Sequence, residues 1–131
     1  MKNQHLIVTK EDFAFLMECY FSEHISAFNK EILSNELKNA KIVMKEYLPG
    51  NVVSANSIVL VCNIDKSQTF NIRIISIEDS TEKPSDIQIS DPLAVALLGY
   101  QTGDIAEWEM RDGINRFQIV SVHQADAVMA V

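Results

Sequence analysis

Cysteine, glycine and proline are all scarce in this sequence of 131 residues, which contains two, four and three of them. Neither Cys19 nor Cys62 has a second cysteine or a metal-ligand spacing near it. We therefore expect two buried, reduced thiols rather than a disulfide or a metal site. The glycines occur singly at turns, so the sequence offers no glycine-rich loop that could cradle a phosphate group.

Long apolar runs and an excess of positive charge are also missing. No run approaches the ~20 apolar residues that cross a bilayer, and residues 1–5 lack the apolar core of a signal peptide. We therefore expect a cytoplasmic protein without a membrane partner. The net charge is −7, from 18 acidic and 11 basic side chains. This charge disfavours direct, sequence-specific binding to a nucleic acid.

The sequence shows no arrangement of a nucleophile beside a base. Its three histidines, His5, His24 and His123, are placed at the N-terminal end, in a predicted turn and in a predicted tail. This spread favours three surface side chains over a metal or catalytic set. We expect a protein that is not an enzyme and that uses neither a metal ion nor another cofactor.

The N-terminal part, residues 1–47, has helical patterns. Thr9 followed by acidic residues is a helix-start signature, and apolar residues recur every three or four positions from Phe13 to Tyr20. We expect helices over 10–21 and 26–41, either as a short hairpin arm or packed on the body. Residues 6–8 could form a short strand or an apolar lead-in. The turn Leu48-Pro-Gly-Asn51 is the predicted boundary of this part.

The C-terminal part, residues 48–131, is rich in predicted strands. Alternating and β-branched patterns favour strands at 57–64, 68–77, 105–111 and 114–122, with a further short strand possible at 52–54. Asp65-Lys-Ser67 and Asp112-Gly113 are predicted hairpin turns. We expect a polar loop over 78–86 and a loose tail over 123–131. Alternation places Trp108 opposite Glu107 and Glu109, which favours a core or half-exposed aromatic side chain.

The central stretch, residues 87–104, predicts a short strand, one buried helix and a turn into the next strand. Asp91 can accept the free N–H groups of the first helical turn, and Pro92 suits the first helical position. The following residues to Leu98 are apolar almost all round, and Gly99 provides a stop. A helix between strands, with turn residues at both ends, suggests a half-barrel sheet wrapped around one helix.

These residues also carry a family resemblance. Ser90-Asp-Pro-Leu-Ala-Val-Ala-Leu-Leu-Gly99, followed by Thr102-Gly-Asp104 and a strand with a tryptophan, resembles the C-terminal domain of the bacterial GreA/GreB transcript-cleavage factors. Segments 35–40 and 52–57 also resemble a relative in this family, the regulator of nucleoside diphosphate kinase (Rnk). The resemblance covers roughly residues 30–123. It implies an α+β fold: a short N-terminal helical hairpin followed by an FKBP-like antiparallel half-barrel with one central helix.

The resemblance also implies a partner. In this family the C-terminal domain grips the rim of the RNA polymerase secondary channel, and the region near the Asp-Pro pair takes part. Carried over, this picks Ser90, Asp91, Pro92 and Leu93 as polymerase-binding residues. The alternative is that Asp91 only caps the helix and Pro92 only begins it. The cleavage factors have a basic residue where this sequence has Val95, so identical contacts are not implied.

The acidic residues of the arm bear on cleavage. Cleavage factors carry carboxylates at the tip of a long helical hairpin, where they help to hold a metal ion in the polymerase active centre. Here the turn offers Glu23, with Glu18 and Glu31 on the helices, and the matching motif is absent. Helices of about 12–16 residues give an arm of roughly 18–24 Å. We expect three solvated surface acids.

The sequence therefore predicts a regulator that docks on RNA polymerase near the secondary channel and competes with cleavage factors without stimulating cleavage. One alternative is a protein-interaction module that affects nucleoside diphosphate kinase. Another is a peptidyl-prolyl isomerase, suggested by fold analogy alone. The effect on transcription, the contact surface and the oligomeric state stay open at this point.

Overall fold

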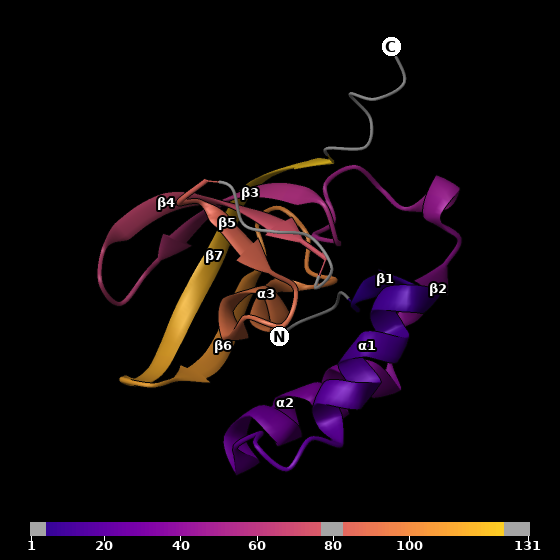
Figure 1. Cartoon of the computed structure of the whole chain (residues 1–131), viewed down its shortest axis with the longest axis horizontal. Coiled ribbons are helices and arrows are strands. Elements are labelled where there is room, and N and C mark those ends of the chain that lie inside the picture. Colours follow the sequence, from indigo (N-terminus) through magenta and orange to yellow (C-terminus); the bar gives the residue numbers. More distant parts are fainter. Residues whose placement is uncertain (1–4, 77–82, 125–131) are drawn as a thin grey trace.

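A curved five-stranded sheet encloses one short helix, and two further helices lie beside it (Figure 1). The computed structural model describes residues 5–76 and 83–124. The strand order of the sheet is β5-β4-β3-β7-β6. The bounds of its strands are β3 Ser57–Asn63, β4 Gln68–Ile75, β5 Asp86–Gln88, β6 Ile105–Met110 and β7 Gly113–Gln124. The predicted α+β fold, with a half-barrel around one helix, is confirmed.

Within the five-stranded sheet, three of the four described strand pairings are antiparallel, as predicted, and the fourth is not. β5 pairs with β4 in parallel, with Arg73 opposite Asp86 and Ile75 opposite Gln88. A strand of three residues is too short for its residue pattern to indicate a direction. Asp86 was expected to end a polar loop and instead begins β5. Residues 78–82 of that loop, and residue 77 of the strand predicted before it, lie outside the described residues.

Other boundaries differ by a few residues. The predicted hairpin turns are present at Asp65–Ser67 and after β6, where the turn is Arg111-Asp112, one residue earlier than expected, and Gly113 begins β7 with φ +123°. β7 continues two residues into the predicted tail, and residues 125–131 lie outside the described residues. In the segment 52–54, a single bridge between Val52 and Gln101 replaces the short strand that seemed possible.

The N-terminal part begins with strand β1 (Ile7–Thr9) and helix α1 (Lys10–Tyr20). The predicted cap is confirmed, because the Asp12 N–H donates to Thr9 Oγ1 at 3.1 Å. Helix α2 covers Ala27–Lys38 and is capped by Ser26. The prediction of a helix to residue 41 was wrong, since residues Lys41–Val43 form strand β2, parallel to β1. The Lys41 N–H donates to the Leu6 carbonyl at 2.8 Å, and this pairing replaces a last helical turn.

One hydrophobic core spans both parts of the chain. Leu6, Val8, Leu16 and Leu33 pack in the same cluster as the inward-facing residues of the sheet and of helix α3 (Pro92–Leu97). The reading with helices packed on the body is therefore confirmed. The division of the chain at residue 48 stays a prediction, and the core crosses it. Trp108 is 5 % exposed and belongs to this core, as alternation indicated.

Cys19 and Cys62 are free thiols, but both are half-buried and not buried as expected. Burial raises the pKa of the Cys19 thiol, and the nearby Glu18 carboxylate adds to that effect.

Among the described helices, none has the length and apolar character needed to span a bilayer.

Candidate functional site

Asp91 sets the geometry at the start of α3. Its Oδ1 accepts a hydrogen bond from the Leu93 N–H at 2.9 Å, and its own N–H donates to the Gln88 carbonyl at 2.8 Å. The Asp91 carbonyl in turn accepts the Val95 N–H at 3.0 Å. A capping carboxylate satisfies an N–H group that the helix leaves without an internal partner. The predicted cap is therefore present, and it fixes the chain where the helix begins.

The residues around this cap differ in exposure. Ser90 and Pro92 are exposed, whereas Asp91 and Leu93 are half-buried. From Ala94 to Leu97 the helix is buried in the core. Only the start of α3 thus reaches the surface, where it presents the Ser90 hydroxyl, the Asp91 carboxylate and the Pro92 ring, while the rest of the helix is buried. This is the arrangement of a rigid contact surface.

An ion pair with a buried carboxylate positions the strand that leads into this turn. Both carboxylate oxygens of Asp86 bond to Arg73, Oδ1 to Nε and Oδ2 to Nη2, each at 2.9 Å. The Asp86 side chain is fully buried, and its Oδ2 also accepts the Lys83 N–H at 3.0 Å. Two parallel bonds between a guanidinium and a carboxylate fix orientation as well as distance. They fasten β5 to β4 and so place residues 90–93.

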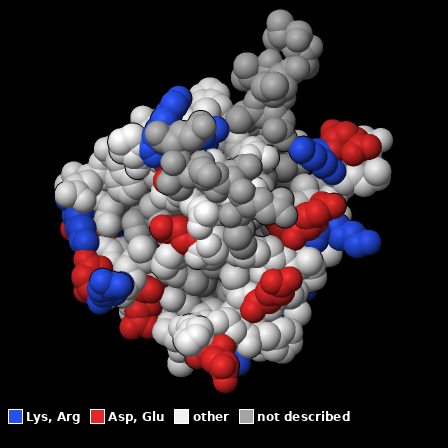
Figure 2. Space-filling model, viewed as in Figure 1, with Lys and Arg blue, Asp and Glu red and all other residues white. Residues whose placement is uncertain are grey.

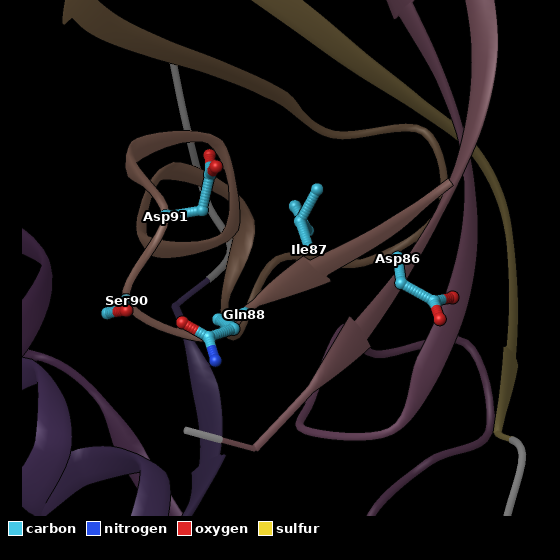
Figure 3. Close-up of a pocket in the computed structure, with 5 residues that line it drawn as sticks. All are labelled: Asp86, Ile87, Gln88, Ser90 and Asp91. Atoms are coloured by element: carbon cyan, nitrogen blue, oxygen red, sulfur yellow. The ribbon is translucent and has the colours of Figure 1, made fainter. Parts of the chain in front are cut away.

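A shallow, open depression of about 440 Å³ borders the same turn. It is lined by Asp86, Ile87, Gln88, Ser90 and Asp91 (Figure 3). The labelled side chains point in different directions, with Asp86 turned away from the helix that Asp91 caps. A small-molecule site needs polar groups that converge on a ligand. The region therefore suits a protein surface better than a small substrate.

Helix α2 is fastened to the body near its first turn. Asn29 forms two hydrogen bonds with the backbone of Glu109: its Oδ1 accepts the N–H at 2.7 Å and its Nδ2 donates to the carbonyl at 3.0 Å. Glu109 lies in β6, the edge strand of the sheet. The Asn29 side chain thus pairs with the edge as a neighbouring strand would, which satisfies both backbone groups.

A second contact fastens the other end of α2. The Tyr100 hydroxyl donates to Glu36 Oε2 at 2.7 Å. Burial, followed by the adjacent Glu36 carboxylate, raises the pKa of Tyr100 well above its ordinary range, so the hydroxyl keeps its proton. With bonds at both Asn29 and Glu36, the helix cannot swing away from the body without losing buried hydrogen bonds.

The three acids of the hairpin are exposed and separate. Glu18 lies in the last turn of α1, Glu23 in the connecting turn and Glu31 in α2. Figure 2 shows acidic side chains over the region of the helices, interspersed with basic ones. Within residues 5–76 and 83–124, no three His, Cys, Asp or Glu residues are grouped so that they could hold a metal ion. The structure does not bring these acids together with residues 90–93.

Sequence reasoning missed the residues that hold helix α2 and the strand before the site in place. Asn29, Tyr100 and Arg73 each bond to a residue that is distant in the sequence, and a local pattern does not indicate such a pair. Asn29 comes three residues after the Ser26 cap, so it reads as an ordinary first-turn residue. One signal was available. A strand at the edge of a sheet, such as β6, has backbone groups that need a hydrogen-bonding partner.

The fold and the capped first turn of α3 define a class of protein. The family model described as "Transcription elongation factor, GreA/GreB, C-term" matches residues 48–124. Since this match covers more than half of the chain, the protein belongs to the GreA/GreB family. The resemblance seen in the sequence is thereby confirmed for the family, and the likeness to the regulator of nucleoside diphosphate kinase stays a prediction.

Particular relatives support the assignment. The chain is 32 % identical to the transcription elongation factor GreA of Clostridium botulinum over 93 residues, 71 % of this chain and 58 % of that protein. It is 33 % identical to GreA of Helicobacter hepaticus over 92 residues, 70 % of this chain and 56 % of that protein. The chain thus matches less than two thirds of the length of either relative.

A solved structure resembles nearly the whole chain. It is the prokaryotic transcription elongation factor GreA/GreB from Nitrosomonas europaea, with a TM-score of 0.63 and 26 % sequence identity. The similarity covers 92 % of this chain and 99 % of that one. The N-terminal helices are therefore included in the shared architecture.

Proposed function

We propose that this protein is a cytoplasmic transcription regulator that docks on RNA polymerase near its secondary channel and does not stimulate transcript cleavage. Its binding surface is the first turn of α3, with Ser90, Asp91, Pro92 and Leu93. The observation that carries this proposal is the surface turn at Asp91-Pro92, at the start of a helix that is otherwise buried. The strand before this turn is held by the Arg73–Asp86 ion pair. The turn lies in the part of the chain that matches the GreA/GreB family model, residues 48–124, which we call the head.

The dimensions of the hairpin support the proposal that the protein does not stimulate transcript cleavage. Helix α1 has 11 residues and α2 has 12, so each is about 16–18 Å long. The bonds from Asn29 and Glu36 hold α2 against the head instead of leaving it as a projecting finger. An arm that is short and fastened cannot carry carboxylates deep into a channel. The protein would occupy a cleavage factor's docking position without delivering metal ligands.

The head also gives little support for the isomerase alternative. Its larger aromatic side chains, Trp108, Phe117 and Tyr100, are buried in the core. The depression beside α3 has no aromatic lining. An aromatic pocket open to a proline-containing peptide is what that activity would need. We therefore keep a non-enzymatic, protein-binding role as the proposal.

A titration of purified core polymerase with Asp91 variants tests the docking surface. Asp91→Asn retains an oxygen that can cap the helix but removes the charge. Asp91→Lys removes both and reverses the charge, with a cap loss of about 1 kcal/mol. We expect affinity to fall modestly for Asp91→Asn and at least tenfold for Asp91→Lys. Glu46→Lys, an exposed reversal in the short helix η1 (Lys45–Tyr47), is the matched control. Equal affinity for all four proteins would remove Asp91 from the interface.

A further inference from the structure

An open groove of about 1190 Å³ lies between the start of α1, the segment that includes β2 and the residues after it, and the loop at residues 54–56. It is distinct from the depression beside α3, because no residue lines both. Ile42 and Met44 line the groove and are 50 % and 61 % exposed. Val43 and Leu48 line it too and are half-buried. One segment along the groove therefore carries four apolar side chains.

The strand in this segment has an open edge. β2 bonds to β1 on one side, where the Lys41 N–H donates to the Leu6 carbonyl at 2.8 Å. No strand within the described residues pairs with the other side of β2. An open strand edge is a template for a further extended segment. The exposed charged residues along the groove are two of each sign: Lys10, Glu11, Lys45 and Glu46. The groove therefore suits an apolar, extended segment better than a strongly charged one.

The chain leaves its last strand at this groove. Gln124 ends β7 and lines the groove together with Ser54. Its Oε1 accepts the Ser54 hydroxyl at 2.9 Å, and its Nε2 donates to the Val52 carbonyl. Residue 125 therefore starts from a fixed point at the groove. Seven extended residues reach at most about 23–25 Å from that point.

The composition of the chain outside the described residues indicates which segment fits. Residues 1–4 are Met-Lys-Asn-Gln, and residues 77–82 are Ile-Glu-Asp-Ser-Thr-Glu. Residues 125–131 are Ala-Asp-Ala-Val-Met-Ala-Val, with a single charged side chain. Polar and charged segments are suited to water, whereas apolar side chains gain free energy on leaving it. Of the three segments, the apolar one is thus the one that is attached at the apolar groove.

We propose that residues 125–131 occupy this groove, with Val128 and Met129 packed against Ile42 and Met44. The contact joins the end of the last strand of the head to the residues that connect the hairpin with the head. It is a strap between two segments that lie about 80 residues apart in the sequence. The proposal does not depend on the binding of RNA polymerase, and its tests use this protein alone.

A nitroxide spin label on the segment tests the contact directly. The label is attached to the full chain at Ala130→Cys, with Cys19→Ala and Cys62→Ala so that only one thiol reacts. We expect the methyl NMR signals of Ile42 and Met44 to be lost through broadening and to return when the nitroxide is reduced. Unchanged signals at both residues would overturn the proposal.

Ile114 is the matched reference for this measurement. It is 51 % exposed, as Ile42 is, but it lies ten residues before Gln124 on β7, roughly 30 Å away along an extended strand. Its methyl signal should stay sharp in the labelled protein. Equal broadening at Ile114 and Ile42 would reject a defined position of the segment in the groove.

A mixing experiment distinguishes one chain from two. Isotope-labelled protein without the nitroxide is mixed with nitroxide-labelled protein of natural isotope abundance. We expect no broadening at Ile42 in this mixture. Broadening there would assign the groove to the segment of a second copy, and the contact within one chain would be wrong.

A double-mutant cycle tests the packing in a chain that keeps both cysteines. Ile42→Ser is combined with Val128→Ser and Met129→Ser, and Ile114→Ser replaces Ile42→Ser in the control cycle. Substitutions at residues in contact are not additive, whereas those at distant residues are. We expect the loss of unfolding free energy in urea to be less than the sum with Ile42→Ser and equal to the sum with Ile114→Ser. Additive losses in both cycles would overturn the proposal.

Discussion

At Gly99 the C-terminal part of the chain is in direct contact with strand β1 of the N-terminal part. Its φ is +86°, and a Cβ atom placed there would lie 2.8 Å from Val8 Cγ1. Its carbonyl accepts the Ile7 N–H at 3.1 Å and its N–H donates to Val53 at 2.9 Å. The glycine therefore does more than end α3, because β1 packs directly against its backbone.

Three glycine-to-alanine variants separate the contributions at Gly99. Gly50→Ala has open space and no strained φ, so its unfolding free energy should change by less than about 0.5 kcal/mol. Gly103→Ala has open space but φ +94°, and should lose about 1 kcal/mol. Gly99→Ala has both the strain and the clash, and should lose roughly 2–4 kcal/mol. Urea denaturation measures all three. Equal losses at Gly99 and Gly103 would show that β1 does not pack on Gly99.

Asp12 makes stability depend on pH in an uncommon direction. It is 5 % exposed, and its burial raises the pKa of the carboxyl, although the Ala55 N–H bond opposes this. The folded protein therefore binds a proton at Asp12 more readily than the unfolded chain. By linkage, this residue's contribution to the unfolding free energy falls as the pH rises from the ordinary Asp pKa through the raised one.

The variant Asp12→Asn tests the direction of this pH dependence. The amide oxygen can still accept the Ala55 N–H, but no charge is buried at any pH. The unfolding free energy of the variant minus that of the parent should increase as the pH rises above about 4 and then level off. Urea unfolding of the two proteins over a pH series measures this difference, in which other titrating groups largely cancel. A difference that decreases with pH would contradict the burial of a charge at Asp12.

At the scale of elements, the amide side chain of Asn29 is one of the contacts that fix the position of α2. Asn29→Ala would leave the Glu109 N–H and carbonyl on an edge strand without their partner. We expect a loss of about 1–3 kcal/mol in unfolding free energy, and faster hydrogen exchange at the Glu109 amide. Asn35→Ala, an exposed change on the same helix, should have little effect. Unchanged exchange at Glu109 would mean that Asn29 does not hold α2 to β6.

The elements also show what a sequence can predict. Asp91, Pro92 and Gly99 specify the bounds of α3 by local chemistry, and those bounds were predicted. β2 was not, because residues 41–43 form a strand by pairing with β1, which is more than 30 residues earlier in the sequence. Likewise, Asn29 and Glu109 are 80 residues apart, and Glu36 and Tyr100 are 64 apart. Tertiary pairs of this kind leave no periodic signal.

At the scale of the whole molecule, one core joins the hairpin to the head. The sequence left open an arm over residues 1–47 or helices packed on the body, and Leu6, Val8, Leu16 and Leu33 pack into the same cluster as the sheet. The contact residues proposed at 90–93 came from family resemblance and not from geometry. The structure shows how the strand that leads into them is held, by the ion pair between Arg73 and the buried Asp86 carboxylate.

A transcript-cleavage assay on stalled polymerase complexes tests the central claim most directly. The protein is titrated alone and then against a fixed amount of a GreA-type cleavage factor, and Asp91→Lys serves as the docking-deficient control. We predict no cleavage above background with the protein alone, and loss of factor-stimulated cleavage as its concentration rises, with a much weaker effect for the variant. Cleavage stimulated by the protein itself, or undiminished factor activity at saturating protein, would contradict the account.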